Sequence, residues 1–412
     1  MGTVAFLRNY HIAKYLSRYF DNTHIITIKN ISIPLKDKIP VDFGQIYSVF
    51  NYDYRNLGNL LSSKNNNLRN KTNAKSNSWK VKFIRKFLDS FPTNVIFGEG
   101  GILYIINATI RAIKIIKKNK ITHIYSSYRP IADHIIAYNI KLLFPGINWI
   151  ADFRDPPVNI NLNNVYLTKL QNWFLKKLLK KANIVTAVSD GVNRSILSYN
   201  PKSITVRNGY YNLFKFDNVD FNMFSMIYTG SLYPDLQKPA VFFKALQLLL
   251  SKKYIEPSYF QLIYAGKDGS IWDKWIEEYD LQKISNNMGE LSLSEAIKLQ
   301  NKSHVNILLS WSGAEQKGVL TGKFYEYIAA GKPIFAFIQG VKDDEFESVF
   351  SELNAGFIFY DKDIQKIEKN ILYFYNEWQK SGKINHIFNK EKLKEYSWEN
   401  RISQLKKMIL PD

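Results

Sequence analysis

The sequence predicts an α/β protein built from two Rossmann-like domains, and three features support this prediction. Apolar runs of strand length alternate with amphipathic helical stretches through most of the 412 residues, as in parallel sheets built from βαβ units. The alternation forms two series, which the turn-prone Arg207-Asn208-Gly209 separates. The chain is also too long for one ordinary core, so a division into two domains is expected.

The first series places an N-terminal domain over residues 1–208. Its expected strands are His24–Ile28, His123–Ser126, Trp149–Phe153 and Ile184–Val188, and its expected helices include 131–143 and 165–181. A doubly wound domain should open with a strand, yet this chain opens on the helix-like segment Phe6–Phe20, so its first strand is expected to be missing. Residues 54–78 are rich in Asn, Ser and Lys and are expected to form a loop.

The second series places a C-terminal domain over residues 209–395. Its expected strands are Ser225–Thr229, Gln261–Ala265, Val305–Leu309 and Ile334–Ile338, and its expected helices are Ala240–Leu250, Ser294–Leu299 and Lys323–Ala330. In such folds ligands commonly bind in clefts at the carboxyl ends of the strands. We therefore expect the functional residues to follow strands.

The composition excludes several classes of chemistry. The absence of cysteine excludes disulfides, zinc knuckles and thiolate nucleophiles, and the six scattered His show no metal-binding spacing, so no metal is expected. Charged residues interrupt the apolar stretches at the N-terminus and around residues 99–114, so neither a signal peptide nor a membrane span is expected. These features indicate a cytoplasmic protein.

The net charge of +20 is confined to one half of the chain. Residues 1–200 contain 29 Lys and Arg against 10 Asp and Glu, whereas residues 201–412 contain 27 against 26. A nucleic-acid binder, a membrane-surface protein and an enzyme with a polyanionic acceptor can all show this asymmetry. The charge thus indicates an anionic partner without choosing its class.

The segment Gly318–Pro333, GVLTGKFYEYIAAGKP, carries the clearest chemical signal. It follows the expected strand Val305–Leu309, and Thr321 is a good N-cap for a helix that Gly331 can end. A helix N-terminus at the mouth of a parallel sheet attracts phosphate through its unpaired N–H groups. Lys323 lies in that first turn, where the helix dipole disfavours a cation unless an anion neutralises it. This combination indicates a bound diphosphate.

Glu326 lies three residues beyond Lys323 on a neighbouring part of the helix surface. A carboxylate there can accept hydrogen bonds from both hydroxyls of a ribose. The alternative is that Glu326 stabilises the helix start and that Lys323 is a solvated surface lysine. Because Glu326 is five residues from Thr321, rather than the three of a capping box, local capping explains it less well.

This segment resembles the donor-site signature of family 4 glycosyltransferases, which have the GT-B fold of two Rossmann-like domains facing across a cleft. The resemblance implies that Lys323 contacts the diphosphate of a nucleotide sugar and that Glu326 binds its ribose. Many members of the family carry two glutamates spaced E-x7-E, and the first of these positions is Gly318 here. Glu315 or Gln316 would have to supply the missing group.

Two further turns in the second half resemble the donor domain of the same family. Ser225–Pro239, SMIYTGSLYPDLQKP, ends a strand in Gly230 and Ser231, and Lys238 follows as a second candidate cation for the phosphates. A glycine there allows backbone to approach a phosphate closely, although an ordinary βα turn explains the motif equally simply. Gly266 ends the next expected strand and is a weaker candidate of the same kind.

The first half offers candidates for the sugar or acceptor side. Trp149–Pro157, WIADFRDPP, resembles a DFRDP stretch in one branch of the family, which makes Arg154 and Asp155 candidate catalytic residues. A salt bridge that braces the loop is an alternative explanation. His134 begins the helix after the preceding strand and is a third candidate, although a lone His there is more often structural.

The resemblance also implies an architecture for the end of the chain and a partner for the basic half. Tyr396–Leu405 resembles the helix that crosses back to the N-terminal domain, so residues 396–412 are assigned to it. Trp79–Leu88 and Leu103–Lys120 combine Lys and Arg with apolar residues at helical spacing, as in helices on anionic membranes. A solvated basic face is the alternative for each helix.

Together these features lead to one functional hypothesis. We expect a metal-independent glycosyltransferase that needs no cofactor and moves a sugar, with retention, from a nucleotide-diphosphate sugar to a saccharide or lipid-linked acceptor in surface polysaccharide synthesis. It would lie in the cytoplasm or peripherally on the inner face of the cell membrane. A non-catalytic nucleic-acid-binding protein and a GT-B sugar-nucleotide epimerase are the alternatives, and no nucleic-acid partner is expected because no recognition motif is present.

Overall fold

The structure is a computed structural model. It describes residues 4–29, 41–51, 87–88, 90–98, 100–128, 130–158, 167–210, 221–234, 236–237, 239–313, 317–318 and 320–410. The chain forms two compact units. Ala5–Arg207 and Gln404–Asp412 make up the N-terminal unit, and Asn208–Ser403 form the C-terminal unit. Among the described residues, no helix is both long and apolar enough to cross a bilayer.

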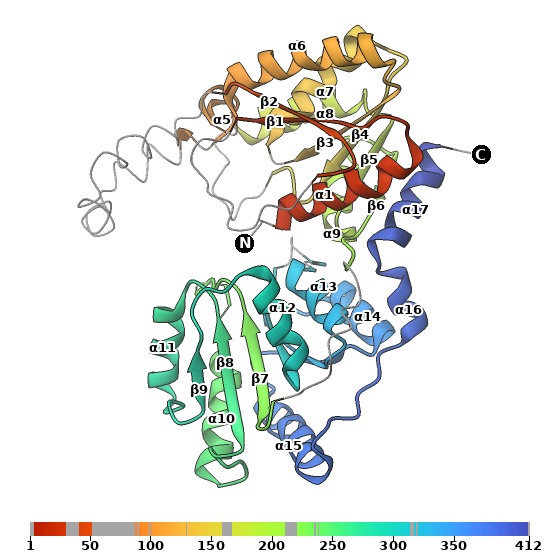
Figure 1. Cartoon of the computed structure of the whole chain (residues 1–412). Helices are drawn as coiled ribbons and strands as arrows, with labels where there is room; N and C mark the ends of the chain where they lie inside the picture. Colours follow the sequence, from red (N-terminus) through yellow and green to blue (C-terminus); the bar gives the residue numbers. More distant parts are fainter. Residues whose placement is uncertain are drawn as a thin grey trace. The chain divides into compact units, whose positions relative to one another are not determined.

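The described strands of the N-terminal unit form two parallel sheets (Figure 1). β1 (His24–Ile28) pairs with β2 (Gln45–Val49), and the second sheet has the order β3-β4-β5-β6. Its strands are β3 (His123–Tyr128), β4 (Asn148–Phe153), β5 (Ile184–Ala187) and β6 (Ser203–Thr205). Four of these six were predicted, whereas β2, which is exposed over much of its length, and β6, which has only three residues, were not.

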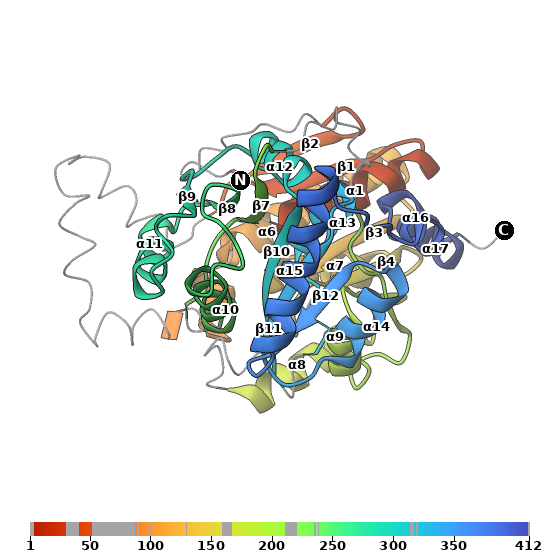
Figure 2. The same cartoon turned by 90° about the horizontal axis from the view of Figure 1, so that it is seen from below.

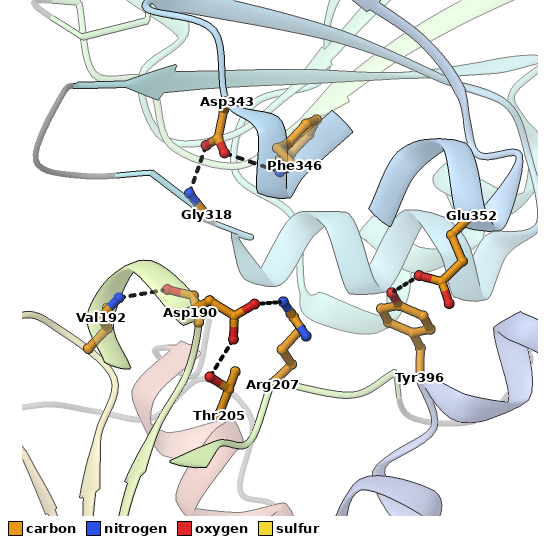
Figure 3. A network of polar contacts seen from close by, with 10 residues as sticks. Asp190, Val192, Thr205, Arg207, Gly318, Asp343, Phe346, Glu352 and Tyr396 are labelled. Carbon is orange, nitrogen blue, oxygen red and sulfur yellow. Dashed lines mark hydrogen bonds and ion pairs between the residues drawn. The ribbon is translucent and has the colours of Figure 1, made fainter. Parts of the chain in front are cut away.

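Helices cover these sheets. They are α1 (Val4–Leu16), α5 (Thr93–Phe97), α6 (Gly101–Asn119), α7 (Ile131–Leu143), α8 (Thr168–Leu179) and α9 (Asp190–Ile196), with a 3-10 turn at Ser17–Tyr19. The predicted helix over 131–143 is confirmed, and that over 165–181 begins at residue 168. α9 starts at the N-cap Ser189, whose hydroxyl accepts from the Val192 N–H, and Arg207 pairs with its first residue Asp190 at 2.6 Å (Figure 3).

The C-terminal unit contains one parallel sheet with the strand order β12-β11-β10-β7-β8-β9. The strands are β7 (Phe224–Thr229), β8 (Phe260–Ala265), β9 (Ser285–Asn287), β10 (Val305–Ser312), β11 (Ile334–Gly340) and β12 (Gly356–Phe359). All four predicted strands are present. The order places β10 between β7 and β11, so the turns that follow these three strands lie along one edge of the sheet.

Helices lie on both faces of this sheet (Figures 1 and 2). α10 (Ala240–Ser251), α11 (Gly269–Glu278) and α15 (Ile364–Ser381) pack on one face, and α13 (Gly322–Ala330), α14 (Asp344–Leu353) and α16 (Lys390–Glu395) pack on the other. α12 (Leu293–Lys302) contacts α13 and β7. Alternation within β10 explains the two cores, because Ile307 and Leu309 point to the first face and Leu308 points to the second.

The end of the chain returns to the N-terminal unit through α17 (Trp398–Ile409). Within that unit the carbonyl of Ile409 lies 3.4 Å from Nε2 of His123 on β3. Within the C-terminal unit, Tyr210 bonds through its backbone to Tyr396 and Trp398, and a Cβ on Gly209 would lie 2.5 Å from the Trp398 nitrogen. Glycine at 209 therefore lets the backbone around Tyr210 lie directly against the backbone of Tyr396–Trp398.

A buried ion pair holds α1 against β4 in the N-terminal unit. The Arg8 guanidinium donates to both carboxylate oxygens of Asp152, at 2.6 and 2.9 Å, and Thr186 donates to the same carboxylate at 2.6 Å. Arg8 is 2% exposed and Asp152 is fully buried. Burial alone would raise the pKa of Asp152, but the charge of Arg8 and the hydrogen bonds lower it below its usual value.

Removing this carboxylate's charge should destabilise the unit. We expect Asp152→Asn to lower the free energy of unfolding by ~3–5 kcal/mol, since it leaves the Arg8 charge buried without a counter-charge. The carboxyl at 155 provides a matched control, because it is 47% exposed and its 3.6 Å pair with Arg154 should contribute less than ~1 kcal/mol.

Chemical denaturation at pH 7 measures both variants. Because the pKa of Asp152 is lowered in the folded state, the wild-type advantage should be present above the usual carboxyl pKa and shrink as the pH falls below it. Equal stability of Asp152→Asn and Asp155→Asn would show that the buried pair contributes no more than the exposed one.

Candidate functional site

Two glycines bring the turns after β7 and β8 into close contact. Gly230 has φ +112°, and its N–H donates to the Ala265 carbonyl at 2.7 Å. A Cβ on Gly266 would lie 2.2 Å from the Gly230 oxygen, so only glycine fits there without movement of the backbone. These two predicted residues therefore do lie together at the carboxyl ends of neighbouring strands.

Lys323, in the first turn of α13, packs directly over this turn. A Cβ on Gly230 would lie 2.5 Å from Cε of Lys323, so the side chain occupies the space that glycine leaves free. The ammonium donates to the Tyr228 hydroxyl and, at 3.1 Å, to the Ser231 carbonyl, and it lies 4.1 Å from the centroid of the Tyr228 ring. Neutral oxygens and an aromatic face thus surround the cation.

These surroundings change the protonation of Lys323. Burial lowers its pKa from the usual 10.5 to about 7, although the carboxylates of Glu326 and Asp268 act in the opposite direction. The lysine expected from the sequence is therefore held in a site that disfavours its charged form. An anion bound beside it would restore the charged form.

Glu326 lies one turn further along α13 and faces the neighbouring elements α12 and β7. Its carboxylate accepts from Nε2 of Gln300 at 3.0 Å, and the same amide donates to the Thr229 hydroxyl at 2.8 Å. Burial raises the pKa of Glu326, while the Gln300 hydrogen bond and the Lys323 charge oppose the rise. The carboxylate is thus oriented by the side-chain amide of Gln300, a residue that is only 1% exposed.

The N-terminus of α13 differs in one respect from the prediction. Thr321 is the N-cap residue, but no capping hydrogen bond to its side chain occurs within the described residues. Gly331 ends the helix with φ +67°, as predicted. The first-turn N–H groups are therefore not satisfied by their N-cap side chain, the condition in which a helix start can bind an anion.

The loop before α13 is tied to the start of α14. The Gly318 N–H donates to Asp343 at 2.8 Å, and the same side chain caps α14 by accepting from the Phe346 N–H at 3.1 Å (Figure 3). Gly318 has φ +77°, a conformation that favours glycine. The loop position eight residues before Glu326 is therefore fixed by its own backbone and by one carboxylate.

The remaining predicted residues belong to the N-terminal unit or lie outside the described part. Arg154 and Asp155 follow β4 and form an ion pair of 3.6 Å, in which Asp155 is 47% exposed. Lys238, Glu315 and Gln316 lie outside the described residues, as do residues 54–78 and most of Trp79–Leu88.

His134 lies in the core of the N-terminal unit and is fully buried. Its Nδ1 is 2.8 Å from the Ser126 hydroxyl, and its ring packs 4.8 Å from that of Phe153. Burial lowers its pKa from 6.5 to about 3. This geometry fits the structural interpretation of a lone His better than a catalytic one.

Sequence reasoning missed several residues that build the site. Tyr228 lies two positions before Gly230, and its hydroxyl donates to the Ser231 carbonyl at 2.7 Å. The Tyr327 hydroxyl lies 3.2 Å from the Thr229 nitrogen, which fixes α13 against β7. β7 is buried along its whole length, so no alternation in its sequence singles out Tyr228. No sequence signal links Gln300 or Tyr327 to Thr229, from which they are separated by 71 and 98 residues.

Similar solved structures show which fold this is. The match with sucrose-phosphate synthase from Thermosynechococcus elongatus covers 99% of this chain and 92% of that protein, with a TM-score of 0.58 and 12% sequence identity. The match with the lipopolysaccharide outer core galactosyltransferase WaaB in its apo form covers 98% of this chain and 94% of that protein, with a TM-score of 0.56 and 9% sequence identity. TarM from S. aureus, in complex with Fondaparinux, alpha-GlcNAc-glycerol and UDP, matches 75% of this chain over 59% of its own, with a TM-score of 0.51 and 12% identity.

These similarities establish an α/β protein with the GT-B fold, as the sequence predicted. In sequence alone, no protein-family model and no curated protein matches the chain. At 9–12% identity the solved structures define the fold and not the activity.

The lowered pKa of Lys323 makes a prediction about stability. Below pH 7 the lysine is charged in both states, so its burial cost is fully present; between pH 7 and 10.5 only the unfolded state keeps the proton, and the cost is relieved. We expect Lys323→Met to stabilise the ligand-free protein at pH 6, by roughly 1–3 kcal/mol, and by less at pH 9.

Denaturation at the two pH values measures this difference. Lys298→Met is the matched control, because Lys298 is exposed on α12 and should give no pH-dependent difference. A Lys323→Met effect that is the same at pH 6 and pH 9 would contradict the assignment.

Proposed function

We propose that this protein is a glycosyltransferase of the EC 2.4 class that uses a nucleotide-diphosphate sugar. One observation carries the proposal: Lys323 and Glu326, at the start of α13, lie beside the carboxyl end of β7, where Gly230 forms the turn. A cation, an uncapped helix N-terminus and a glycine turn suit a diphosphate, and an oriented carboxylate suits the two hydroxyls of a ribose.

The chemistry of transfer fits this arrangement. The bond from the anomeric carbon to the diphosphate oxygen breaks and its electron pair stays on the diphosphate, the bond to the acceptor oxygen forms, and the proton of the acceptor hydroxyl passes to the leaving diphosphate. Negative charge grows on the leaving diphosphate, where Lys323 and the α13 N-terminus would stabilise it. The resemblance to family 4 suggests a hexosyl or N-acetylhexosaminyl transfer with retention, and we propose that it needs no metal.

The N-terminal unit would supply the acceptor side. Arg154 and Asp155 follow β4 at its carboxyl end, the position where ligand sites of α/β domains occur. We propose that these two residues contact the sugar or a saccharide or lipid-linked acceptor. UDP in the TarM complex supports the nucleotide part of the proposal for a chain of the same fold.

Nucleotide binding provides the direct test. Calorimetry with UDP, GDP, ADP and their sugar conjugates should identify the one base that binds. Lys323→Ala should weaken the binding of the nucleoside diphosphate by about 10–100-fold and leave the affinity for the free nucleoside unchanged. Glu326→Gln should weaken the binding of both the nucleoside diphosphate and the nucleoside, because it removes a carboxylate acceptor from the ribose.

Lys298→Ala is the matched control, and thermal melting checks that each variant is folded. Release of the nucleoside diphosphate in the presence of saccharide acceptors, unaffected by EDTA, would complete the test. A protein that binds none of the nucleotides would exclude the proposal.

A membrane contact is the second part of the proposal, and the exposed face of α6 supports it. The first half of this face is apolar, with Ile102, Leu103, Ile106 and Ile110 each at least 40% exposed. The second half is basic and contains Arg111, Lys114, Lys117 and Lys118. Figure 1 shows α6 lying along the outside of the N-terminal unit beside β1 and β2. We propose that this face rests on the anionic inner surface of the cell membrane, in a surface polysaccharide pathway.

Vesicle sedimentation tests this contact. Replacing Lys114, Lys117 and Lys118 by Glu should reduce binding to phosphatidylglycerol-containing vesicles by at least about tenfold at low salt, since each near-surface cation contributes ~1 kcal/mol. The same replacements at the exposed Lys274, Lys283 and Lys298 of the C-terminal unit change the net charge equally. Equal losses in the two triple variants would attribute binding to net charge rather than to α6.

A further inference from the structure

A carboxylate from α14 lies in the space where a side chain at position 318 would be. A Cβ built on Gly318 would lie 1.9 Å from Oε2 of Glu345 and 2.4 Å from its Cδ. Position 318 is therefore not an empty place in the loop, because Glu345 covers it. Glu345 is itself partly exposed, in contrast to its neighbours Asp343 and Phe346, which are buried.

Three contacts bind the loop at 317–318 to the first turn of α14. The Gly318 N–H donates to Asp343, Lys317 pairs with Asp344 at 3.6 Å, and the Glu345 carboxylate occupies the space where a Cβ on Gly318 would lie (Figure 3 shows the Asp343 contact). Asp343 also caps α14. These contacts hold the loop against the start of α14, the helix that carries Glu345.

The strand order places this carboxylate on the side of the site opposite Glu326. Glu326 bonds through Gln300 to Thr229 at the end of β7, whereas Glu345 belongs to the helix that follows β11. β10 lies between β7 and β11, and its loop leads to Lys323 in the middle. If the ribose is held on the β7 side and the diphosphate at Lys323, the sugar attached to the far phosphate extends towards β11.

We propose that Glu345 binds the hydroxyl groups of the donor sugar and selects neutral hexoses against uronic acids. This inference rests on the proposed use of a nucleotide-diphosphate sugar. A carboxylate accepts hydrogen bonds from adjacent hydroxyls and repels a sugar that carries its own carboxylate. Elsewhere in the same segment, Lys317 pairs with Asp344 at 3.6 Å and Lys342 pairs with Glu347 at 3.2 Å.

The test separates recognition of the sugar from recognition of the nucleotide. For the base that binds, affinities are measured for the nucleoside diphosphate alone, its neutral hexose conjugates and its hexuronic acid conjugate. We expect Glu345→Gln and Glu345→Ala to leave the nucleoside diphosphate affinity within about twofold while weakening the best hexose conjugate by at least about tenfold. The preference over the uronic acid conjugate should shrink in both variants.

Two further variants control for the structure of the loop. Glu347→Gln alters a carboxylate of the same helix turn, which accepts from Tyr360 at 2.7 Å, and should leave the sugar preference unchanged. Gly318→Ala would place a methyl group where the Glu345 carboxylate lies, so it should reproduce the Glu345→Ala preference if it still binds the nucleoside diphosphate.

The outcomes distinguish this inference from the function on which it rests. If the wild-type protein binds nucleotide sugars and the Glu345→Gln variant has the same sugar preference, only the role of Glu345 is overturned. An equal loss of affinity for the nucleoside diphosphate and its conjugates also overturns it, because Glu345 would then act only on the loop. Wild-type protein that binds no nucleotide overturns both.

Discussion

The packing of Lys323 on Gly230 is the contact on which the rest of the C-terminal site depends. It requires a turn without a Cβ after β7, a helix that follows the adjacent strand β10 in the chain, and the Tyr228 ring beside the ammonium. The groups that hold the ammonium by hydrogen bonds are a phenol and a backbone carbonyl, neither of which carries charge. A full ion pair would satisfy the lysine permanently, whereas this arrangement leaves its charge available to an incoming anion.

The parts of this site that could be predicted from the sequence are those that follow from local rules. Gly230 ends an apolar strand, Lys323 and Glu326 begin a helix, and Gly331 ends it, so hydrophobic periodicity and capping residues locate all four. The partners of Glu326 could not be located in this way. Gln300 meets Thr229 only because β7 pairs with β10, and that pairing joins residues about 80 positions apart. β9, whose sequence is Ser-Asn-Asn, has no apolar residue to reveal it.

In the N-terminal unit, the sequence does not distinguish structural polar residues from residues that a ligand could reach. His134, Asp152 and Arg154 all lie at a strand end or a helix start, the places where ligand sites of α/β domains occur. Only tertiary contacts separate them. Arg8, 144 residues away, neutralises Asp152 in the core, and the ring of His134 packs among aromatic side chains, whereas Arg154 stays partly exposed. Burial, rather than residue type, thus divides structural polar groups from those that a ligand could reach.

The first turn of α14 illustrates how a function could move between positions while the fold stays the same. Acidic residues are common in a first helical turn because they complement the helix dipole, and this explains Asp344 and Glu347, which pair with nearby lysines. It does not explain why Glu345 lies against a glycine with positive φ in a separate loop. A side chain at position 318 would meet the carboxylate of Glu345, so an acid in the loop would require the Glu345 side chain to move. Under the proposed function, Glu345 would therefore place a carboxylate beside the loop at a position where the sequence itself has glycine.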